Sequence, residues 1–293
     1  MTGVLHDPDA FAGEAPRLVA LAYRITGSRT EAEDVVQDAW LRWHGADRAA
    51  IERPAAWLTT VTSRLALDRL RSARHRREAY VGPWLPEPTT TPPDPAERAE
   101  LAESLTVGFL ALLERLSPTE RVVFLLADVF AVPFAEIAEV VDKTPEACRQ
   151  VASRARRRVR DDRPRFAPTD DEAWRVTSAF LVAAQQGDLE ALVDLLADDA
   201  EAVSDGGPAV HAARRPVLAG RIPRFVVNLT KRLAPDDEVL PVTVNGQPGV
   251  AVRRHGRTTL ALAVAVADGR VQRVWSVLNP DKLARLDAEL DNT

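Results

Sequence analysis

The chain has 293 residues, of which 46% are hydrophobic and 28% are charged, so it is long enough for two or three folded domains and too apolar for a disordered protein. Its formal net charge of −5 is unusual for a protein that binds nucleic acid. The cations, however, gather at residues 64–77 and 149–165, and contacts with phosphates depend on such local charge. We therefore expect any contact of the free chain with a polyanion such as nucleic acid to be weak.

The single cysteine, Cys148, excludes an internal disulfide and fits a reducing compartment. No apolar run is long enough to span a bilayer, and the first residues lack the charged-then-apolar pattern of a signal peptide. We expect a cytoplasmic protein without membrane contact. Since HExxH, paired-cysteine and glycine-rich phosphate signatures are all missing from the sequence, we also expect no metal and no cofactor.

Residues 9–77 predict three or four helices. A first apolar stripe ends at Gly27, and Ser28 is a capping-box candidate for the helix that follows. Pro54 begins a long helix that ends in Arg-His-Arg-Arg, which suits phosphate contacts; cations favoured by the dipole at a helix C-terminus are the alternative explanation. On the helix between them, the residues assigned to the buried side are Val35, Val36, Ala39, Trp40 and Trp43.

Residues 79–95 contain six prolines and predict an extended linker. Trp84 and Leu85 are unusual there, because large apolar side chains in a linker either dock on a domain or lower solubility. We favour docking. Beyond this linker the chain is predicted to be helical again, with an amphipathic helix at 96–116 and a capping box that begins at Ser117.

Residues 134–165 predict two short helices joined by a tight turn. Asp142-Lys143 ends the first helix, and Thr144 and Pro145 supply the N-cap and first position of the second. One face of the second helix is apolar, through Cys148, Val151, Ala152, Ala155 and Val159. The opposite face carries Arg149, Gln150, Ser153, Arg156, Arg157 and Arg160. The pattern is typical of a helix-turn-helix that reads the DNA major groove, where arginine suits guanine and phosphates; a solvated basic helix is the alternative.

Residues 171–290 change period. Two helices separated at 187–188 are predicted from Trp174, Phe180, Leu181, Leu189, Leu192, Leu195 and Leu196. After a further helix at 221–233, four apolar runs alternate with turn signals such as Asn245-Gly246. A last helix spans 281–290. Helices followed by a run of antiparallel strands indicate an α+β domain in which helices pack on a curved sheet.

Several of these motifs resemble the extracytoplasmic-function sigma factors of bacterial RNA polymerase. The segments that carry the resemblance are AEDVVQDAWLRW, AWLTTVTSRLALDRLR and the stretch 117–159, and they cover nearly all of residues 10–165 in the expected order. WLPEP at 84–88, Asp-Gly-Gly at 205–207 and NPDKL at 279–283 further resemble the subgroup with a fused C-terminal SnoaL-like domain.

The resemblance implies a multi-domain fold with two all-α domains followed by an α+β cone. The implied domains are sigma region 2 at 9–78, the proline-rich linker at 79–95, the helix-turn-helix sigma region 4 at 96–166 and the SnoaL-like domain at 171–290. One departure is visible. Where the subgroup continues its glycine motif with Gly-Lys, this chain has Pro208-Ala209, so the contact of that lysine is in doubt.

The resemblance also implies three contact surfaces, for each of which a solvated helix face is the alternative. The residues placed on the coiled-coil clamp of the largest polymerase subunit are Asp34, Gln37, Asp38 and Arg42. Those at the promoter −10 element, where a flipped base enters a pocket formed by 45–54, are Trp57, Thr60, Arg64, Arg71 and Arg74. Those at the −35 element are Arg149, Gln150, Ser153, Arg154, Arg156 and Arg157.

For the last domain the favoured hypothesis is regulation in cis. That domain and the helix 281–290 would pack against WLPEP and both DNA-binding domains and set their separation. The residues assigned to this role are Trp84, Leu85, Pro86, Glu87, Pro88, Asp205, Gly206, Gly207, Asn279, Pro280, Asp281, Lys282 and Leu283. A small ligand in the domain is left open.

Catalysis is weighed because the cone fold hosts enzymes. The nearby polar candidates are Asp199, Asp205, His211, Arg253 and His255, with His211 expected on a loop and His255 in a turn. We expect no enzyme. The predicted function is a sigma factor whose partners are core polymerase, at its clamp and flap, and promoter DNA, with no separate anti-sigma factor strictly required. The alternatives are a stand-alone helix-turn-helix regulator with a ligand-sensing domain and an enzyme whose helical half mediates oligomerisation.

Overall fold

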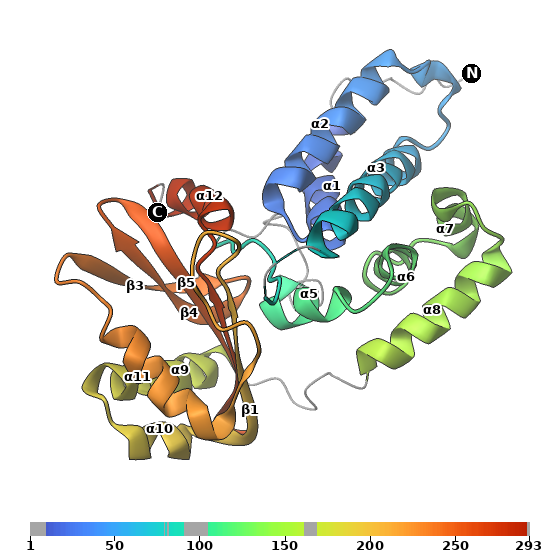
Figure 1. The fold of residues 1–293 in the computed structure, drawn as a ribbon. Coiled ribbons are helices and arrows are strands. Elements are labelled where there is room, and N and C mark those ends of the chain that lie inside the picture. Colours follow the sequence, from blue (N-terminus) through green and yellow to red (C-terminus); the bar gives the residue numbers. More distant parts are fainter. Residues whose placement is uncertain (1–9, 79, 81, 91–104, 161–168, 292–293) are drawn as a thin grey trace. The chain divides into compact units, whose positions relative to one another are not determined.

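The computed structural model describes residues 10–78, 80, 82–90, 105–160 and 169–291, without the side chains of 74–78 and 160 (Figure 1). Among these residues, those within 1–78 and 112–162 form one compact unit, and those within 79–92, 105–111 and 163–293 form a second. The described part of the segment predicted as a linker, residues 80 and 82–90, therefore folds with the C-terminal unit. The helix predicted at 96–116 lies partly outside the described residues, which include α5 (Val107–Leu113).

Three helices that pack on one another begin the first unit: α1 (Ala10–Thr26), α2 (Arg29–Gly45) and α3 (Pro54–Glu78). Local chemistry sets their ends. Gly27 adopts φ 72° and ends α1, and the Ser28 hydroxyl accepts the amide of Glu31 at 3.1 Å and caps α2. The stretch between α2 and Pro54 contains one 3₁₀ turn, Arg48–Ala50.

The rest of the first unit holds α6 (Pro118–Phe124), a π-helical segment (Leu125–Val129), α7 (Phe134–Val141) and α8 (Pro145–Arg160). Ser117 and Glu120 form the predicted capping box on α6. Asp142 adopts φ 53° and ends α7, and the Thr144 hydroxyl accepts the amide of Ala147 at 3.2 Å to begin α8. The helix-turn-helix geometry thus follows from local capping.

The prediction that Trp40 belongs to the buried side of α2 is wrong. Its side chain is 42% exposed and stacks on His44, with 3.9 Å between the ring centroids. The buried residues of α2 are Ala32, Val35, Val36, Ala39 and Trp43. At about 100° per residue, Trp40 lies at the edge of the stripe that these residues form, so its ring can face solvent.

A six-stranded sheet forms the centre of the second unit, in the order β2-β1-β6-β5-β4-β3. Its strands are β1 (Leu196–Asp205), β2 (Val217–Leu218), β3 (Asp237–Val244), β4 (Gln247–Arg254), β5 (Arg257–Ala267) and β6 (Arg270–Val277). β3 to β6 form the predicted antiparallel run, whereas β1 lies parallel to β6. Leu196, predicted in a helix, is the first residue of β1.

Two-residue turns join the antiparallel strands. Asn245-Gly246, His255-Gly256 and Asp268-Gly269 all have positive φ at both positions, 51° and 73° in the first. Such pairs form the turns whose twist matches that of the flanking strands. His255 is therefore a turn residue, as expected.

The two faces of the sheet are covered by different elements (Figure 1). α9 (Asp170–Gln186), α10 (Leu189–Leu195) and α11 (Ile222–Thr230) enclose one core, which includes Phe180, Leu192 and Val264. α12 (Pro280–Asp291) packs on the other face with Leu85, Val107 and Trp275. None of the helices in the described part of the chain has both the length and the apolar character that crossing a membrane requires.

Candidate nucleic-acid interface and linker-docking site

The exposed side of α8, which we call the basic face, gathers all six residues predicted at the −35 element. Its apolar back is buried, with Cys148 and Ala152 at 0% exposure, and packs on α6 and α7. Burial also raises the pKa of the Cys148 thiol. The residues of the basic face, all exposed, are Arg149, Gln150, Ser153, Arg154, Arg156 and Arg157.

Ion pairs hold the arginines at the edge of the basic face. Arg149 lies 3.2 Å from Glu146 and over the ring of Phe134, and Arg156 lies 2.7 Å from Asp128. Arg158 lies 2.8 Å from Glu120. Burial works to raise the pKa of Glu120, but hydrogen bonds from Ser117 and the charge of Arg158 outweigh it and lower this pKa. Pairs exposed to solvent contribute only about 0–1 kcal/mol, so phosphates can replace these carboxylates.

On α3 the predicted −10 residues lie along one helix but differ in their contacts. Trp57 packs on Trp43 with 5.6 Å between ring centroids. Arg64 donates to the carbonyl of Glu139 in α7 at 2.7 Å. Thr60 is partly exposed, Arg71 pairs with Asp68 at 3.5 Å, and the Arg74 side chain lies outside the described residues.

α7 also holds the loop before α3, where Arg53 pairs with Glu136 at 2.9 Å. In the first unit, the first helix of the helix-turn-helix therefore contacts the surface that is predicted to bind the −10 element. A buried arginine adds a second connection between these modules, because Arg121 is 1% exposed and donates to the carbonyl of Arg24 at 2.9 Å and to Glu114.

The predicted clamp-binding residues lie on the outer side of α2. Asp34 and Asp38 pair with Arg69 of α3 at 3.7 and 3.2 Å, while Gln37 and Arg42 are exposed. Beside them, Trp40 and Leu41 are 42% and 57% exposed. Sequence reasoning missed this apolar patch because it assigned Trp40 to the core. Exposed apolar side chains rimmed by charges mark protein-binding surfaces.

The Asp205 side chain organises the docking site for the segment 80–90. It is completely buried at the end of β1 and pairs with Lys282 at 2.7 Å. The carboxylate also accepts the hydroxyl of Tyr80 at 2.5 Å, the amide of Leu85 at 2.8 Å and the amide of Gly207 at 3.0 Å. The three sequence motifs at 84–88, 205–207 and 279–283 thus meet at one carboxylate.

Lys282 connects the same elements from α12. Its ammonium group donates to the carbonyl of Leu85 and lies 3.9 Å from the ring centroid of Trp84. Asn279 donates to the Tyr80 hydroxyl at 2.9 Å. Burial, together with the hydrogen bond and charge of Asp205, raises the pKa of Tyr80 above its ordinary value. Sequence reasoning missed Tyr80, which lies outside the WLPEP motif.

The remaining residues predicted to form the docking site differ in how deeply they are buried. Leu85 is 2% exposed, Pro86 and Pro88 are buried, and Glu87 is partly exposed. Leu283 is buried beside Leu85, whereas Pro280 and Asp281 are exposed at the start of α12. Gly206 and Gly207 are both buried. The backbone of Gly207 has φ 58°, and a Cβ there would lie only 2.6 Å from the side-chain nitrogen Nδ2 of Asn279.

The far end of the docked segment is held by contacts that no motif signalled. The hydroxyl of Thr89 and the amide of Thr90 donate to Glu289 of α12, at 3.0 and 2.7 Å. The backbone of Thr89 also exchanges two hydrogen bonds with Asn245, one with its amide and one with its side chain. α12 therefore fixes the segment at both ends.

The polar residues weighed for catalysis do not share one site. Asp205 belongs to the docking site, Arg253 pairs with Asp291 at 2.7 Å, and His255 lies in the β4–β5 turn. Asp199 is exposed in β1, and His211 lies on the loop after it. Within the described ranges, no cluster of three or more His, Cys, Asp or Glu side chains is suited to a metal ion.

These features first define a class: a helix-turn-helix DNA-binding protein with a second helical module and an α+β domain. The family model for sigma-70 region 2 matches residues 11–76, and that for sigma-70 region 4 matches residues 107–159. The chain is 41% identical over 280 residues to the "ECF RNA polymerase sigma factor SigJ" of Mycobacterium tuberculosis, covering 90% of this chain and 89% of that one.

Two further comparisons extend this likeness. A probable "ECF RNA polymerase sigma factor SigI" of the same species is 34% identical and covers 97% of this chain and 98% of its own. The crystal structure of M. tuberculosis SigJ superposes with a TM-score of 0.75 at 37% identity, over 95% of this chain and 98% of that one. The chain therefore belongs to the extracytoplasmic-function family of sigma-70 RNA polymerase sigma factors and functions in transcription initiation.

Proposed function

We propose that this sigma factor brings core RNA polymerase to promoters with −10 and −35 elements, and that its C-terminal unit regulates this activity in cis. The polymerase clamp would bind the outer side of α2 at Gln37, Asp38 and Arg42. The exposed Trp40 and Leu41 support this assignment, because apolar side chains among charges supply the buried centre of an interface.

The basic face of α8 is the proposed reader of the −35 element. Its arginines are exposed, their carboxylate partners are replaceable, and the apolar back anchors the helix in the unit. Arginine forks bind guanine edges and phosphates, and Gln150 suits adenine. The unit binds DNA weakly alone, and polymerase makes the second promoter contact effectively intramolecular.

The proposed −10 surface on α3 includes Arg64, which is bonded to α7 in the free chain. Promoter binding would therefore require α7 to release Arg64 and Arg53. Both contacts are single polar interactions near solvent, so a large partner that binds the two modules separately can replace them.

Regulation by the C-terminal unit rests on one observation: the buried Asp205–Lys282 pair is completed by the backbone of Leu85. Removing the segment would leave a buried carboxylate and a buried ammonium short of partners, which is costly. Residues 80 and 82–90, the described part of the segment, are thus held in one register. We propose that the docked state sets how far the two DNA-reading modules can separate.

The test is run-off transcription by full-length Lys282→Met with core polymerase, compared with Lys231→Met, which removes an exposed lysine of the same unit. We expect Lys282→Met and Trp84→Ala to change promoter-specific transcription while Lys231→Met does not. Equal transcript levels for all three and the unaltered protein would refute regulation in cis.

A gel-shift experiment with and without core polymerase tests the first part of the proposal. We expect a specific promoter complex only when core polymerase is present. Tight, sequence-specific binding by the chain alone at physiological salt would instead indicate a stand-alone regulator.

A further inference from the structure

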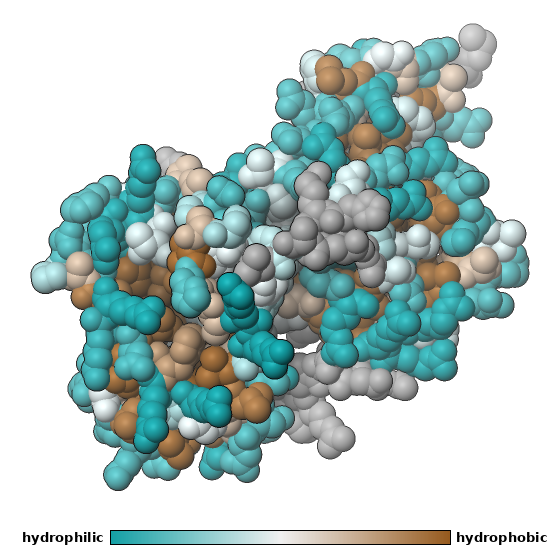
Figure 2. Space-filling view, viewed as in Figure 1, coloured by the Kyte–Doolittle hydropathy of each residue, from teal (hydrophilic) through white to brown (hydrophobic). Residues whose placement is uncertain are grey.

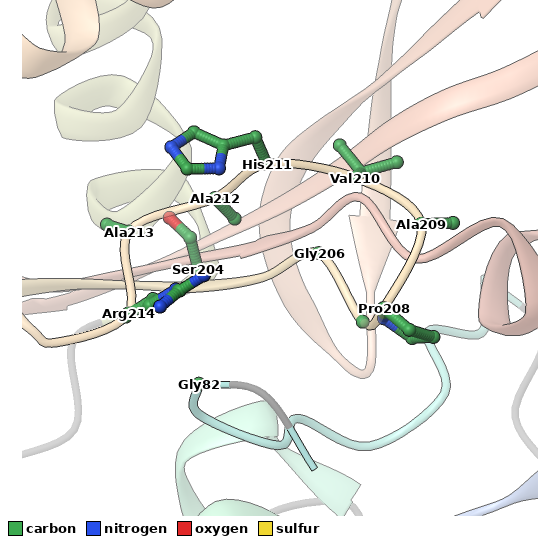
Figure 3. A pocket seen from close by; sticks show the side chains of 11 residues that line it. Gly82, Ser204, Gly206, Pro208, Ala209, Val210, His211, Ala212, Ala213 and Arg214 are labelled. Carbon is green, nitrogen blue, oxygen red and sulfur yellow. The ribbon is translucent and has the colours of Figure 1, made fainter.

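The loop between β1 and β2 encloses a cavity of about 270 Å³ (Figure 3). Its wall is formed by residues 206–214, by Ser204 of β1 and by Gly82 of the docked segment. α9, α10 and α11 contribute no described residue to it. Pro208, Ala209 and Val210 lie at one end of the loop, Ala213 and Arg214 lie at the other end beside Ser204, and His211 lies between the two ends (Figure 3).

The Ser204 hydroxyl is the group at this cavity that points to a bound ligand. Ser204 is 2% exposed, and its oxygen has no hydrogen-bond partner. Figure 3 shows its side chain rising from β1 toward the part of the loop that carries His211 to Ala213. Buried hydroxyl groups are nearly always hydrogen-bonded. The Ser204 oxygen is itself buried, so an oxygen bound in the cavity would satisfy this group once the Ser204 side chain rotates toward it.

The side chains around Ser204 favour an anion. Arg214 and His211 line the same cavity and are exposed, and in the described part of the chain no carboxylate pairs with either. No acidic residue is among those that line the cavity. Asp205, the next residue along β1, binds Lys282 and the docked segment, so its charge is neutralised there.

From these observations we propose that the cavity binds a small oxyanion, a phosphate or a carboxylate group. Arg214 supplies a planar fork of donors that fits either group. The Ser204 hydroxyl donates to an oxygen of the anion, and His211 closes the site from the loop. The volume of about 270 Å³ admits a molecule of small size around that group.

The position of Gly82 connects this site to the docked segment. Gly82 has φ 87°, and its ideal Cβ position lies 3.6 Å from the Arg214 Cα. The residue precedes Trp84 and Leu85 by only a few positions, so a bound anion would stabilise the wall that the segment forms. Anion binding does not depend on the proposed regulation, whereas an effect of the anion on transcription does.

The test is calorimetric titration of the full-length protein with inorganic phosphate and, separately, with acetate, at constant ionic strength set with sodium chloride. We expect saturable binding of at least one anion. Arg214→Gln should weaken it about tenfold or more, because a charge-assisted bond is lost, and Ser204→Ala should weaken it severalfold. The matched control is Arg215→Gln, which removes the neighbouring exposed charge outside the cavity.

Binding of phosphate alone assigns a phosphate group, and binding of acetate alone assigns a carboxylate. Absence of binding for both anions, or equal weakening by Arg214→Gln and Arg215→Gln, overturns the site. Hydrogen exchange of the backbone at 82–90 is then measured with and without the anion. Slower exchange supports the link to the docked segment, and unchanged exchange on a saturated site overturns that link while leaving the site standing.

Discussion

The charged side chains of α8 are exposed to solvent, whereas those around Asp205 are buried. On α8, Arg149 and Arg156 pair with carboxylates in contact with solvent. At the docking site, Asp205 and Lys282 are almost fully excluded from water, and backbone groups of a distant segment complete their hydrogen bonds. The first arrangement can exchange its partners for DNA phosphates, whereas the second holds one partner in place.

Figure 2 shows one face of the molecule coloured by hydropathy. Hydrophilic side chains cover much of that face, with apolar patches between them. A charge in such a surface is stabilised mainly by water, so losing its ion partner costs little. A charge buried like Asp205 depends on its protein partners instead, so losing one costs several kcal/mol.

The largest effect is expected for Lys282→Met, which leaves the Asp205 carboxylate buried without its cation. We expect the free energy of unfolding to fall by about 3–5 kcal/mol. Equilibrium urea unfolding of the full chain measures this, with Lys231→Met as the exposed control. The double variant Asp205→Asn/Lys282→Met should recover part of the loss, and a single variant as stable as the control would contradict the role given to the pair.

Tyr80→Phe should have the next largest effect, a loss of about 1.5–3 kcal/mol, because the hydroxyl donates to a charged carboxylate. The pH dependence distinguishes this from lost packing. Since the pKa of Tyr80 is raised from 10.0 in the folded state, the neutral hydroxyl stabilises fully below pH 10, and that contribution falls as the pH rises above 10.

Stability measured between neutral and alkaline pH tests this directly. The unaltered protein should lose stability more steeply above pH 10 than Tyr80→Phe does. If the two stability curves are parallel above pH 10, ionisation of the Tyr80 hydroxyl does not affect the stability of the folded protein, which contradicts the role given to its bond with Asp205.

On α8, Arg157→Gln should leave stability within about 0.5 kcal/mol, because the side chain is exposed. With core polymerase present, promoter affinity should fall by a similar factor across sequences, and the slope of log affinity against log salt should shrink by about one. The control Arg175→Gln makes the same charge change on α9 and should leave the slope unaltered. If the slope of log affinity against log salt is the same for Arg157→Gln and Arg175→Gln, α8 does not contact promoter DNA through Arg157.

The smallest effect is expected for Asp128→Asn, which removes the partner of Arg156 and should change stability by only about 0–1 kcal/mol. Promoter affinity in the polymerase complex should stay unchanged or rise slightly. In this variant Arg156 does not have to break an ion pair with Asp128 before it binds a phosphate. Thermal unfolding and the same salt titration check both values. If Asp128→Asn lowers the free energy of unfolding as much as Lys282→Met does, the proposed difference between the exposed ion pairs of α8 and the buried pair at Asp205 is wrong.

Much of the local structure was predictable because its causes lie within a few residues. Ser117 with Glu120 caps α6, Thr144 caps α8, and Asn245-Gly246 turns β3 into β4. The apolar back and basic face of α8 follow from helical period alone.

Other features depended on residues far apart in the chain. Tyr80 and Leu85 meet Asp205 across separations of 125 and 120 residues, and Thr89 meets Glu289 across 200. The parallel pairing of β1 with β6 and the exposure of Trp40 likewise required the assembled fold.

By itself, then, the sequence determined the helices and their ends, the hairpins and the basic face of α8, since capping, turn conformation and helical period act between near neighbours. Only the tertiary structure decided which buried charge is paired with which, where the proline-rich segment lies and which aromatic side chains face solvent. Those outcomes depend on desolvation, and a side chain is desolvated by whatever the whole fold places next to it.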